Sequence, residues 1–564
     1  SSAASDVYKR QIEKRLDGIS ELSEKAMLRD EIREYLNPIY DLERLLGKVS
    51  YKTANPRDLL AFAGSLKMLP SIKVLLNDFS SDILKKIQEE TDDLTDVCTL
   101  IERAICEEPP LAIREGGIIR DGFDENIDRL RHAKNDGKTW LARLEEEDRE
   151  RTGIKNLKVK YNKVFGYYFE VTNSFKNMVP EDYIRKQTLS NCERFITQEL
   201  KELESKVLGA QERMVQLEYQ IFSDVRTRVA DELYRVQRTA HAVARLDVLC
   251  SFAQTAVSYD YTRPVVDAGD RLEITDGRHP VVERMLEDAP FVPNDTALDC
   301  KDYRCAIITG PNMAGKSTYM RQVALITLMA QIGSFVPARS AQIGVVDSIF
   351  TRVGASDDLA AGQSTFMVEM SEVASILQNA TAKSLILLDE IGRGTSTYDG
   401  MSIARAVLEF CADSKKLGAK TLFATHYHEL TELENQVAGV KNYNIAVKKR
   451  GDEITFLRRI IRGGADGSYG VEVAKLAGVP VSVVKRARVI LKALEGGSRS
   501  GAGPAEIPDA AELPEEEENP LLQISIAGNT SAEIMEQLKN IDVNTLTPIE
   551  ALTMLHELVR KAKR

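Results

Sequence analysis

The sequence predicts a multidomain protein: an all-α part, a small β insert, an α/β part that carries a P-loop motif, and helical C-terminal elements. Three observations predict this architecture. Leucines recur at helical spacing in the first part, strand and helix patterns alternate from about residue 266, and an acidic stretch precedes the last residues. A chain of 564 residues is long enough for about three or four domains.

The composition is that of a soluble protein with large cores, because hydrophobic residues make up 43% and charged residues 29% of the chain. The net charge is −11, so contact with nucleic acid would need a local basic patch. None of the seven cysteines forms a Cys-x-x-Cys pair, which indicates a reducing, cytoplasmic location. No apolar run reaches about 18 residues, so we expect no membrane span.

The N-terminal part is predicted to be helical. Residues 1–11 differ from the helical sequence after them, and we expect a leader that is not native to the protein. From 12 to 154, apolar residues fall on single helix faces, as Leu42, Leu45 and Leu46 do. Prolines punctuate these helices, which predicts the first part of an all-α region.

A β-rich insert is predicted at 155–205. Aromatic and β-branched residues at 158–162 and 166–171, bounded by Asn and Gly, favour short strands. The proline-free stretch 206–257, within a return segment 206–265, predicts a single long helix. At 1.5 Å per residue, about fifty residues would form an arm of roughly 75 Å, which suggests a lever or coiled element.

The α/β part is predicted to span 266–463. In it, residues 310–317 read Gly-Pro-Asn-Met-Ala-Gly-Lys-Ser, which fits the phosphate-binding pattern of Gly, any four residues, and Gly-Lys-Ser/Thr. The apolar residues 305–308 precede it as a strand should, and a proline-free helix pattern follows. Backbone N–H groups would face the phosphates, Lys316 would reach the β- and γ-phosphates, and Ser317 would hold magnesium.

Two further strand ends carry polar residues. Asp389 and Glu390 end an apolar run that we expect beside the phosphate loop, where Asp389 would serve magnesium and Glu390 would act as general base on water. The alternative is a strand that ends in solvated acids. A later apolar run leads to His426, which would lie beside the same phosphate. A zinc site is an alternative interpretation of His426, His428 and Glu429, although these residues lack the His-Glu-x-x-His spacing.

The segment Leu359–Ser364 lies between these motifs and resembles the signature segment of ABC-type ATPases. This resemblance implies that Ser364 contacts the γ-phosphate bound to a partner subunit. The alternative is a plain loop before a helix that begins near Met367. The glycine-rich stretch 392–400, directly after Glu390, predicts a flexible polar loop that senses hydrolysis.

The insert is locally basic, because residues 155–194 include eight basic and four acidic residues. This excess predicts contact with a nucleic-acid backbone, while a solvated face over an aromatic core explains the insert equally well. The predicted DNA-binding residues are Lys155, Lys158, Lys160, Lys163, Lys176, Arg185 and Lys186.

The C-terminal part is predicted to contain helices around a linker. A helical segment lies within 464–495, and residues 496–530 form an acidic linker that we expect to be disordered. The tail 531–564 regains amphipathic spacing but is too small to bury its own core. We therefore expect it to be an oligomerisation element.

Five stretches of the chain form long and specific motifs: Thr309–Gln322, Phe350–Asp358, Asp389–Gly400, Ala424–Tyr427 and Ser468–Gly470. These motifs resemble those of the MutS family of DNA mismatch repair ATPases. The insert 155–205 resembles the DNA clamp of that family, and the helices on either side resemble its core and lever.

The resemblance implies roles for individual residues. Phe291 would stack on adenine, with Arg458 where the family often has histidine, and a guanidinium can also stack on a base. Glu390, Lys316 and His426 would be catalytic, His426 as a switch, while Ser317 and Asp389 would bind the metal. The residues implied in binding ATP are Gly310, Pro311, Asn312, Met313, Ala314, Gly315, Lys316, Ser317, Thr318, Phe291, Arg458 and Ser364.

The resemblance also implies ATP, ADP and Mg²⁺ as ligands, double-stranded DNA, a MutL-type repair partner and a homodimer as partners. The segment 464–495 would be a helix-turn-helix used in dimerisation, and the C-terminal tail would extend the dimer to a tetramer. The family's mismatch-reading and connector domains should lie upstream of this sequence, so we expect mismatch recognition itself to be lost. Two alternatives are the nucleotide subunit of another ABC-type ATPase and a MutS-type clamp that holds DNA or recombination intermediates without reading mismatches.

Overall fold

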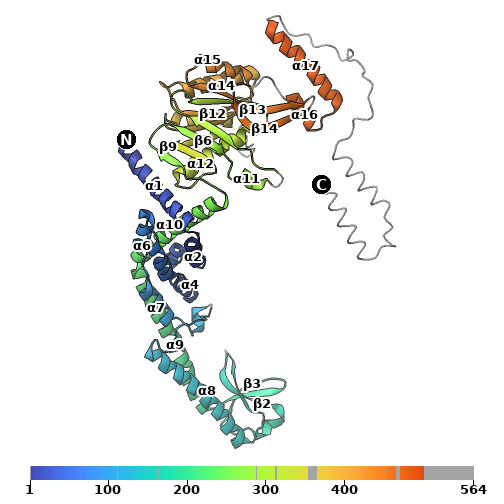
Figure 1. Cartoon of the computed structure of the whole chain (residues 1–564). Coiled ribbons are helices and arrows are strands. Elements are labelled where there is room, and N and C mark those ends of the chain that lie inside the picture. Colours follow the sequence, from blue (N-terminus) through green and yellow to red (C-terminus); the bar gives the residue numbers. More distant parts are fainter. Residues whose placement is uncertain are drawn as a thin grey trace, which may run out of the picture. The chain divides into compact units, whose positions relative to one another are not determined.

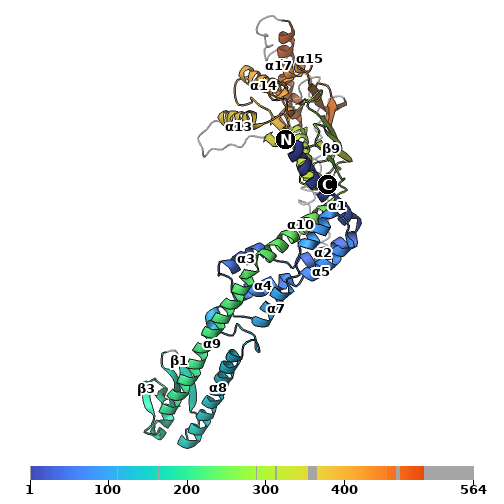
Figure 2. The same cartoon turned by 90° about the vertical axis from the view of Figure 1, so that its left-hand side faces the viewer.

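The computed structural model of the chain divides into two compact units, Ser1–Ser468 and Tyr469–Arg564, which are described separately. Figures 1 and 2 show the chain from two directions. The structure describes residues 2–110, 112–162, 164–286, 289–311, 314–353, 365–450, 453–464 and 470–500.

The N-terminal part is helical, as predicted. Its apolar faces converge on one core that includes Phe62, Leu66 and Leu246. Asn55 and Asp58 form a capping box at the start of α4, each side chain accepting the other's backbone N–H. The helices are α1 (Ser2–Glu24), α2 (Ala26–Leu36), α3 (Leu42–Ser50), α4 (Pro56–Leu66), α5 (Leu69–Leu75), α6 (Asp82–Glu90), α7 (Thr95–Ala104) and α8 (Glu125–Thr152).

Helix α1 includes the residues that the sequence set apart as a leader, because it is continuous from Ser2 to Glu24. Ile12 and Leu16 of this helix are buried against the α/β part. Whether residues 1–11 are native stays a prediction.

One helical run among the described residues, Pro56–Asp78, is long and apolar enough to cross a membrane by length and composition alone. It contains α4, α5 and the 3-10 turn η1 (Leu76–Asp78). Leu59, Phe62 and Leu69 of this run are fully buried in the helical core. This packing is that of a core helix.

The insert forms an antiparallel sheet with the strand order β1-β2-β4-β3. Strands β1 (Lys158–Asn162) and β2 (Gly166–Thr172) match the two predicted strands. Strands β3 (Ile184–Thr188) and β4 (Cys192–Ile196) were not predicted, and β3 is exposed at most positions, so it lacks the alternation that marks a strand. Figure 1 shows this sheet at the end of α8.

The single long helix predicted for 206–257 is instead two helices. Helix α9 (Gln198–Asp231) begins earlier than predicted, where the Thr197 side chain accepts the N–H of Leu200. Glu232, with ψ near 13°, separates it from α10 (Leu233–Ser258). At 1.5 Å per residue, the 34 residues of α9 extend for about 51 Å. Figure 2 shows α8 beside α9.

The α/β part contains two sheets. The six-stranded sheet has the order β10-β11-β12-β8-β13-β14, and all its neighbouring strands are parallel except β13 and β14. The four-stranded sheet has the order β5-β9-β6-β7. The strands are β5 (Val265–Asp267), β6 (Leu272–Gly277), β7 (Asn294–Leu298), β8 (Cys305–Thr309), β9 (Ser340–Gly344), β10 (Ile349–Arg352), β11 (Leu385–Asp389), β12 (Lys420–Ala424), β13 (Val440–Arg450) and β14 (Glu453–Arg462).

Helices cover both faces of the six-stranded sheet, because residues of β8 alternate between two cores. Ala306 and Ile308 face the core that contains α12, while Cys305 and Ile307 face the core that contains α13 and α14. The helices of the α/β part are α11 (Val282–Met285), α12 (Lys316–Gln331), α13 (Thr365–Asn379), α14 (Thr397–Ala412) and α15 (Leu433–Gln436), and the 3-10 turn η5 (His428–Glu432) precedes α15. The β insert contains the 3-10 turn η3 (Asn173–Met178).

The described part of the second unit is a pair of helices, α16 (Gly470–Leu476) and α17 (Val481–Ser500), joined by a turn at Gly478. Glu472 and Arg488 form an ion pair of 3.3 Å between them. Helix α17 continues to Ser500, so residues 496–500 of the predicted linker are helical. The remainder of that linker and the tail 531–564 lie outside the described residues.

Candidate functional site

The predicted phosphate loop connects β8 to α12. Gly310 has a φ of 135° and Gly315 a φ of 107°, in the region that favours glycine. The fully buried strand β8 fixes one end of the loop, and the first turn of α12 carries Lys316 and Ser317. The N–H groups of such a helix start attract anions. Asn312 and Met313 lie outside the described residues, while Pro311, Ala314 and Thr318 are present in the loop and first turn.

Lys316 is buried, with 3% of its side chain exposed. Its ammonium group donates a hydrogen bond of 2.6 Å to the carbonyl of Gly310 and lies 3.8 Å from Oε1 of Glu390. Burial lowers the pKa of Lys316, while Glu390 and Asp389 act in the opposite direction. A buried cation in the first turn of a helix is well placed to bind a phosphate, because the N–H groups of that turn also attract anions.

Asp389 and Ser317 meet at the edge of the sheet. The Ser317 hydroxyl donates a hydrogen bond of 2.5 Å to Oδ2 of Asp389, and burial raises the pKa of this carboxyl group. Oδ1 of Asp389 is buried and has no hydrogen-bond partner among the described residues. A hydroxyl and a carboxylate with an unused oxygen are the hard ligands that Mg²⁺ prefers. These residues therefore fit a magnesium ion.

Glu390 follows β11 directly. Its N–H donates to the carbonyl of Ala424 at 2.9 Å, and its φ of 52° is uncommon for a residue with a side chain. One carboxylate oxygen faces Lys316 and the other accepts a 2.6 Å bond from Arg393. The unusual backbone therefore turns the carboxylate toward the phosphate loop rather than along the strand.

The strand of Asp389 ends beside the phosphate loop without pairing with the strand that leads into the loop. Strand β12 lies between β8 and β11. The carboxyl ends of all three strands still meet at one edge, because they are parallel.

His426 lies just beyond β12, at the edge of the sheet that holds Glu390. Its ring contacts that of Tyr427 in a tilted arrangement, with centroids 4.2 Å apart and 38° between the ring planes. Partial burial lowers the pKa of His426, and Glu390 opposes this shift. No group of three His, Cys, Asp or Glu side chains in the described ranges could hold a metal ion, so nothing there supports zinc at His426, His428 and Glu429.

The segments predicted to hold adenine come together. The side-chain amide of Asn294 donates to the carbonyl of Arg458 at 3.0 Å and accepts the N–H of Ile460 at 2.7 Å. Phe291 is half-buried and lies three residues before Asn294, while Arg458 is exposed with a φ of 54°. The structure thus ties the two chain segments together. Ser364, predicted to act in trans, lies outside the described residues.

Two residues that the sequence did not single out hold the loop after Glu390. Oε1 of Glu369 accepts the N–H of Gly392 at 2.6 Å, and the Tyr427 hydroxyl donates to the carbonyl of the same glycine at 3.2 Å. Glu369 lies on α13 and Tyr427 follows β12. Nothing in the local sequence marks these contacts, because both go to backbone atoms far along the chain.

The predicted DNA-binding cations of the insert are all exposed, except Lys163, which lies outside the described residues. Three of them are paired with acids of the sheet: Lys160 with Glu170 at 2.7 Å, and Lys176 and Arg185 with the buried Glu193 at 2.7 and 3.7 Å. Among the described residues, no ion pair involves the other three, which are Lys155, Lys158 and Lys186.

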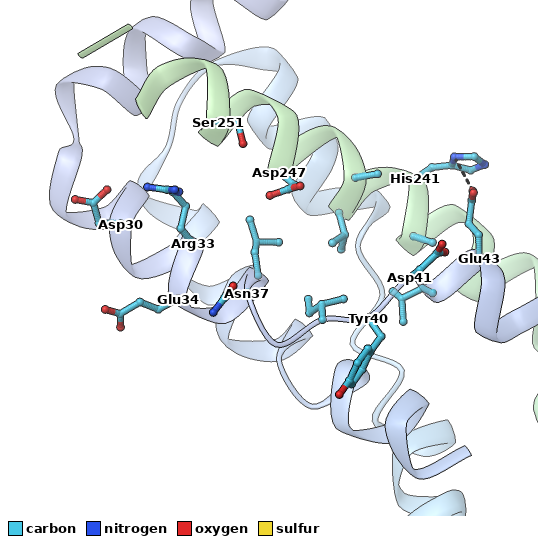
Figure 3. Close-up of a pocket in the computed structure, with 16 residues that line it drawn as sticks. Asp30, Arg33, Glu34, Asn37, Tyr40, Asp41, Glu43, His241, Asp247 and Ser251 are labelled. Atoms are coloured by element: carbon cyan, nitrogen blue, oxygen red, sulfur yellow. Dashed lines mark ion pairs between the residues drawn. The ribbon is translucent and has the colours of Figure 1, made fainter. Parts of the chain in front are cut away.

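A hollow of about 890 Å³ lies away from these residues, between α2, α3 and α10 (Figure 3). Among the charged side chains of its lining, carboxylates outnumber basic groups, and His241 forms an ion pair of 3.4 Å with Glu43. An acidic lining repels phosphate, so this hollow is no alternative nucleotide site. The acidic residues are Asp30, Glu34, Asp41, Glu43 and Asp247.

The residues assembled here lie in a region that matches the model of a known family. The family model described as MutS domain V matches residues 306–495, which contain the phosphate loop, Asp389, Glu390 and His426. The DNA mismatch repair protein MutS of Acetivibrio thermocellus is 58% identical over 552 residues, which are 98% of this chain and 63% of that protein. This chain belongs to the MutS family.

Two further family models match. MutS family domain IV covers residues 122–213, which include the insert, all of α8 and the start of α9, and the C-terminal region of DNA mismatch repair protein MutS covers 529–561. The MutS protein of Lachnoclostridium phytofermentans is 63% identical over 484 residues, 86% of this chain and 52% of that protein. That of Ruminiclostridium cellulolyticum is 57% identical over 549 residues, 97% of this chain and 62% of that protein. The chain thus spans less than two thirds of the length of these relatives.

Proposed function

We propose that this chain is a magnesium-dependent ATP hydrolase that binds duplex DNA, acting in mismatch repair as its relatives are named to do. The observation that carries the proposal is the convergence of Lys316, Ser317, Asp389 and Glu390 at one edge of a parallel sheet. Ser317 and Asp389 would hold the Mg²⁺, and the chemistry that a bound Mg²⁺ supplies is neutralisation of phosphate charge. Phe291 and Arg458 would enclose the adenine.

The residues divide the work of hydrolysis. Lys316 gives up its bond to the Gly310 carbonyl and binds the β- and γ-phosphates of ATP. Glu390 accepts a proton from the attacking water as general base. His426, at the end of the neighbouring strand, would contact the γ-phosphate side and respond when ADP is formed. ATP binding and hydrolysis would then move the helical lever and the insert on DNA.

The test is Glu390→Gln, which keeps the shape of the side chain but removes its basicity. Turnover should fall by about 100-fold or more, the scale expected for losing a general base. ATP binding should persist, because the loop and Lys316 are unchanged. Glu409→Gln is the matched control, since Glu409 is partly exposed on α14 and its one ion pair among described residues is with the neighbouring Arg405. Equal turnover of Glu390→Gln and the wild-type chain would remove Glu390 from this role.

The proposed assembly is a homodimer with composite sites, in which Ser364 of one subunit covers the nucleotide held by Lys316 of the other. Dimerisation would use 464–495, the tail 531–564 would add a tetramer contact, and a MutL-type protein would be the repair partner. Mixing a Ser364→Ala chain with a Lys316→Ala chain should restore part of the activity that each lacks alone. A fully active monomer would contradict the assembly.

A second candidate function is a clamp that holds DNA without reading mismatches. It is favoured by the exposed cations of the insert, because contacts to phosphates position a protein but carry no sequence information. Affinity for two duplexes that differ by a single mismatch separates the candidates. Equal affinity supports the clamp, and clear preference for the mismatch supports recognition within this chain.

A further inference from the structure

Gly392, two residues after Glu390, is held on three sides. Its N–H points at Glu369, its carbonyl accepts the Tyr427 hydroxyl, and a side chain there would meet the Gly400 carbonyl at 2.4 Å. Its φ of 87° strains any residue other than glycine. The chain therefore leaves Glu390 by a path with little freedom.

Glu369 is buried, with 7% of the residue exposed, which is unusual for a carboxylate side chain. A buried carboxylate is costly unless it is compensated, and no ion pair of Glu369 occurs in the described part of the chain. Its compensation comes from the 2.6 Å bond to the Gly392 N–H, a charge-assisted bond that is stronger than a neutral one. The Glu369 carboxylate is thus aimed at the loop of Glu390.

A second contact joins the same helix to the same loop. A Cβ on Gly394 would lie 3.0 Å from Cβ of Phe366, so the loop backbone rests on the first turn of α13. Glu369 lies about one helical turn beyond Phe366 on α13. Any displacement of the start of α13 would therefore move Gly392 and Gly394 together, and Glu390 with them.

We propose that Glu369 is a positioning residue for hydrolysis, which holds Glu390 in place through the backbone of Gly392. This inference rests on the proposed function, because it needs Glu390 to act as general base. Helix α13 begins directly after Ser364 in the sequence. Variants of Glu369 test only the contact between Glu369 and Gly392.

The experiment compares Glu369→Ala, Glu369→Gln and the control Glu409→Gln in the full chain. A shift of about 1 Å in a catalytic group can reduce a rate by ~100-fold. Glu369→Ala should lower kcat by roughly 10- to 100-fold with little change in the Kd for ATP. Glu369→Gln should recover part of this loss, because its amide oxygen can still accept the Gly392 N–H. The control should match the wild-type chain.

A double-mutant cycle separates positioning from general damage. If Glu369 acts through Glu390, then Glu369→Ala should slow wild-type turnover but cause no further loss in a Glu390→Gln background. Independent, multiplying losses would overturn the proposal, as would a Glu369→Ala chain with wild-type kcat. Should Glu369→Ala fold poorly, the same cycle with Glu369→Gln provides the test, because its partial loss should likewise vanish in the Glu390→Gln background.

The outcomes also distinguish this inference from the proposed function. If the wild-type chain hydrolyses no ATP, or if Glu390→Gln is as active as wild type, the proposed function fails whatever Glu369 does. If Glu390→Gln is inactive and Glu369→Ala is normal, the proposed function stands and the positioning role is wrong.

Discussion

The two groups of cations on the insert should contribute differently to DNA binding. Lys155, Lys158 and Lys186 are exposed and have no ion pair among described residues, so their charges are available to phosphates. Each phosphate contact contributes about 0.9 to the slope of log affinity against log salt concentration. Replacing all three with glutamine should therefore reduce the slope by up to ~2.7 per bound subunit. Folding stability should be unchanged, because exposed and unpaired side chains stabilise little.

The paired cations form the matched set. Lys176 and Arg185 form ion pairs with Glu193, a residue that is only 2% exposed, and so balance its negative charge. Lys160 balances the charge of Glu170 in the same way. Replacing these three with glutamine should lower the melting temperature, since a buried carboxylate would lose its counter-charges. The salt slope should fall less than for the first set, because these charges already neutralise acids of the sheet.

Fluorescence anisotropy of a labelled duplex, titrated at several salt concentrations, measures both slopes. Thermal melts of the same chains measure stability. Equal slope reductions by the two sets would refute the division between free and paired cations. An unchanged slope after replacement of the first set would refute DNA contact by this face of the insert.

Three other outcomes are expected. The pKa of Asp389 is raised in the fold, so the chain loses stability as pH rises from the unfolded to the folded pKa of this group, and the loss is constant above it. Asp389→Asn should therefore raise the melting temperature at neutral pH without Mg²⁺ and abolish Mg²⁺-dependent ATP binding. A melting temperature at or below wild type would contradict this. Gly392→Ala should cost at least about 1–2 kcal/mol for its left-handed backbone alone, visible in chemical denaturation, whereas wild-type stability would mean that the loop relaxes without strain. Trp140, the only tryptophan of the chain, lines a hollow with Leu203 between α8 and α9, so its emission should change when DNA binds the insert; constant emission would indicate that these helices do not shift.

The sequence was informative where the chemistry is local. Glycine positions and an adjacent Lys-Ser pair define the phosphate loop over eight residues, and Asp389 and Glu390 follow an unbroken apolar strand. The structure brings these residues together as their motifs predict. Their roles stay predictions.

The sequence was less informative where structure depends on distant partners. Glu369 holds the backbone of Gly392, and a hydrogen bond to a backbone atom leaves no trace in the residue type of its partner. The break between α9 and α10 falls at Glu232, where neither glycine nor proline marks it. The position of β12 between β8 and β11 depends on the order of strands in space, which the spacing of motifs along the chain does not specify.

Helix α1 has a consequence for how this chain can be made and divided. Ile12 and Leu16 complete a core whose other members, such as Val323 and Ile343, are synthesised some three hundred residues later, and Arg15 donates to the Ile332 carbonyl at the end of α12. During synthesis, these apolar side chains stay unpacked until the residues they contact have been made, so this core forms late in folding. An expressed fragment of 266–463 would leave an uncovered apolar groove, and its solubility should improve when residues 12–24 are supplied as a separate peptide.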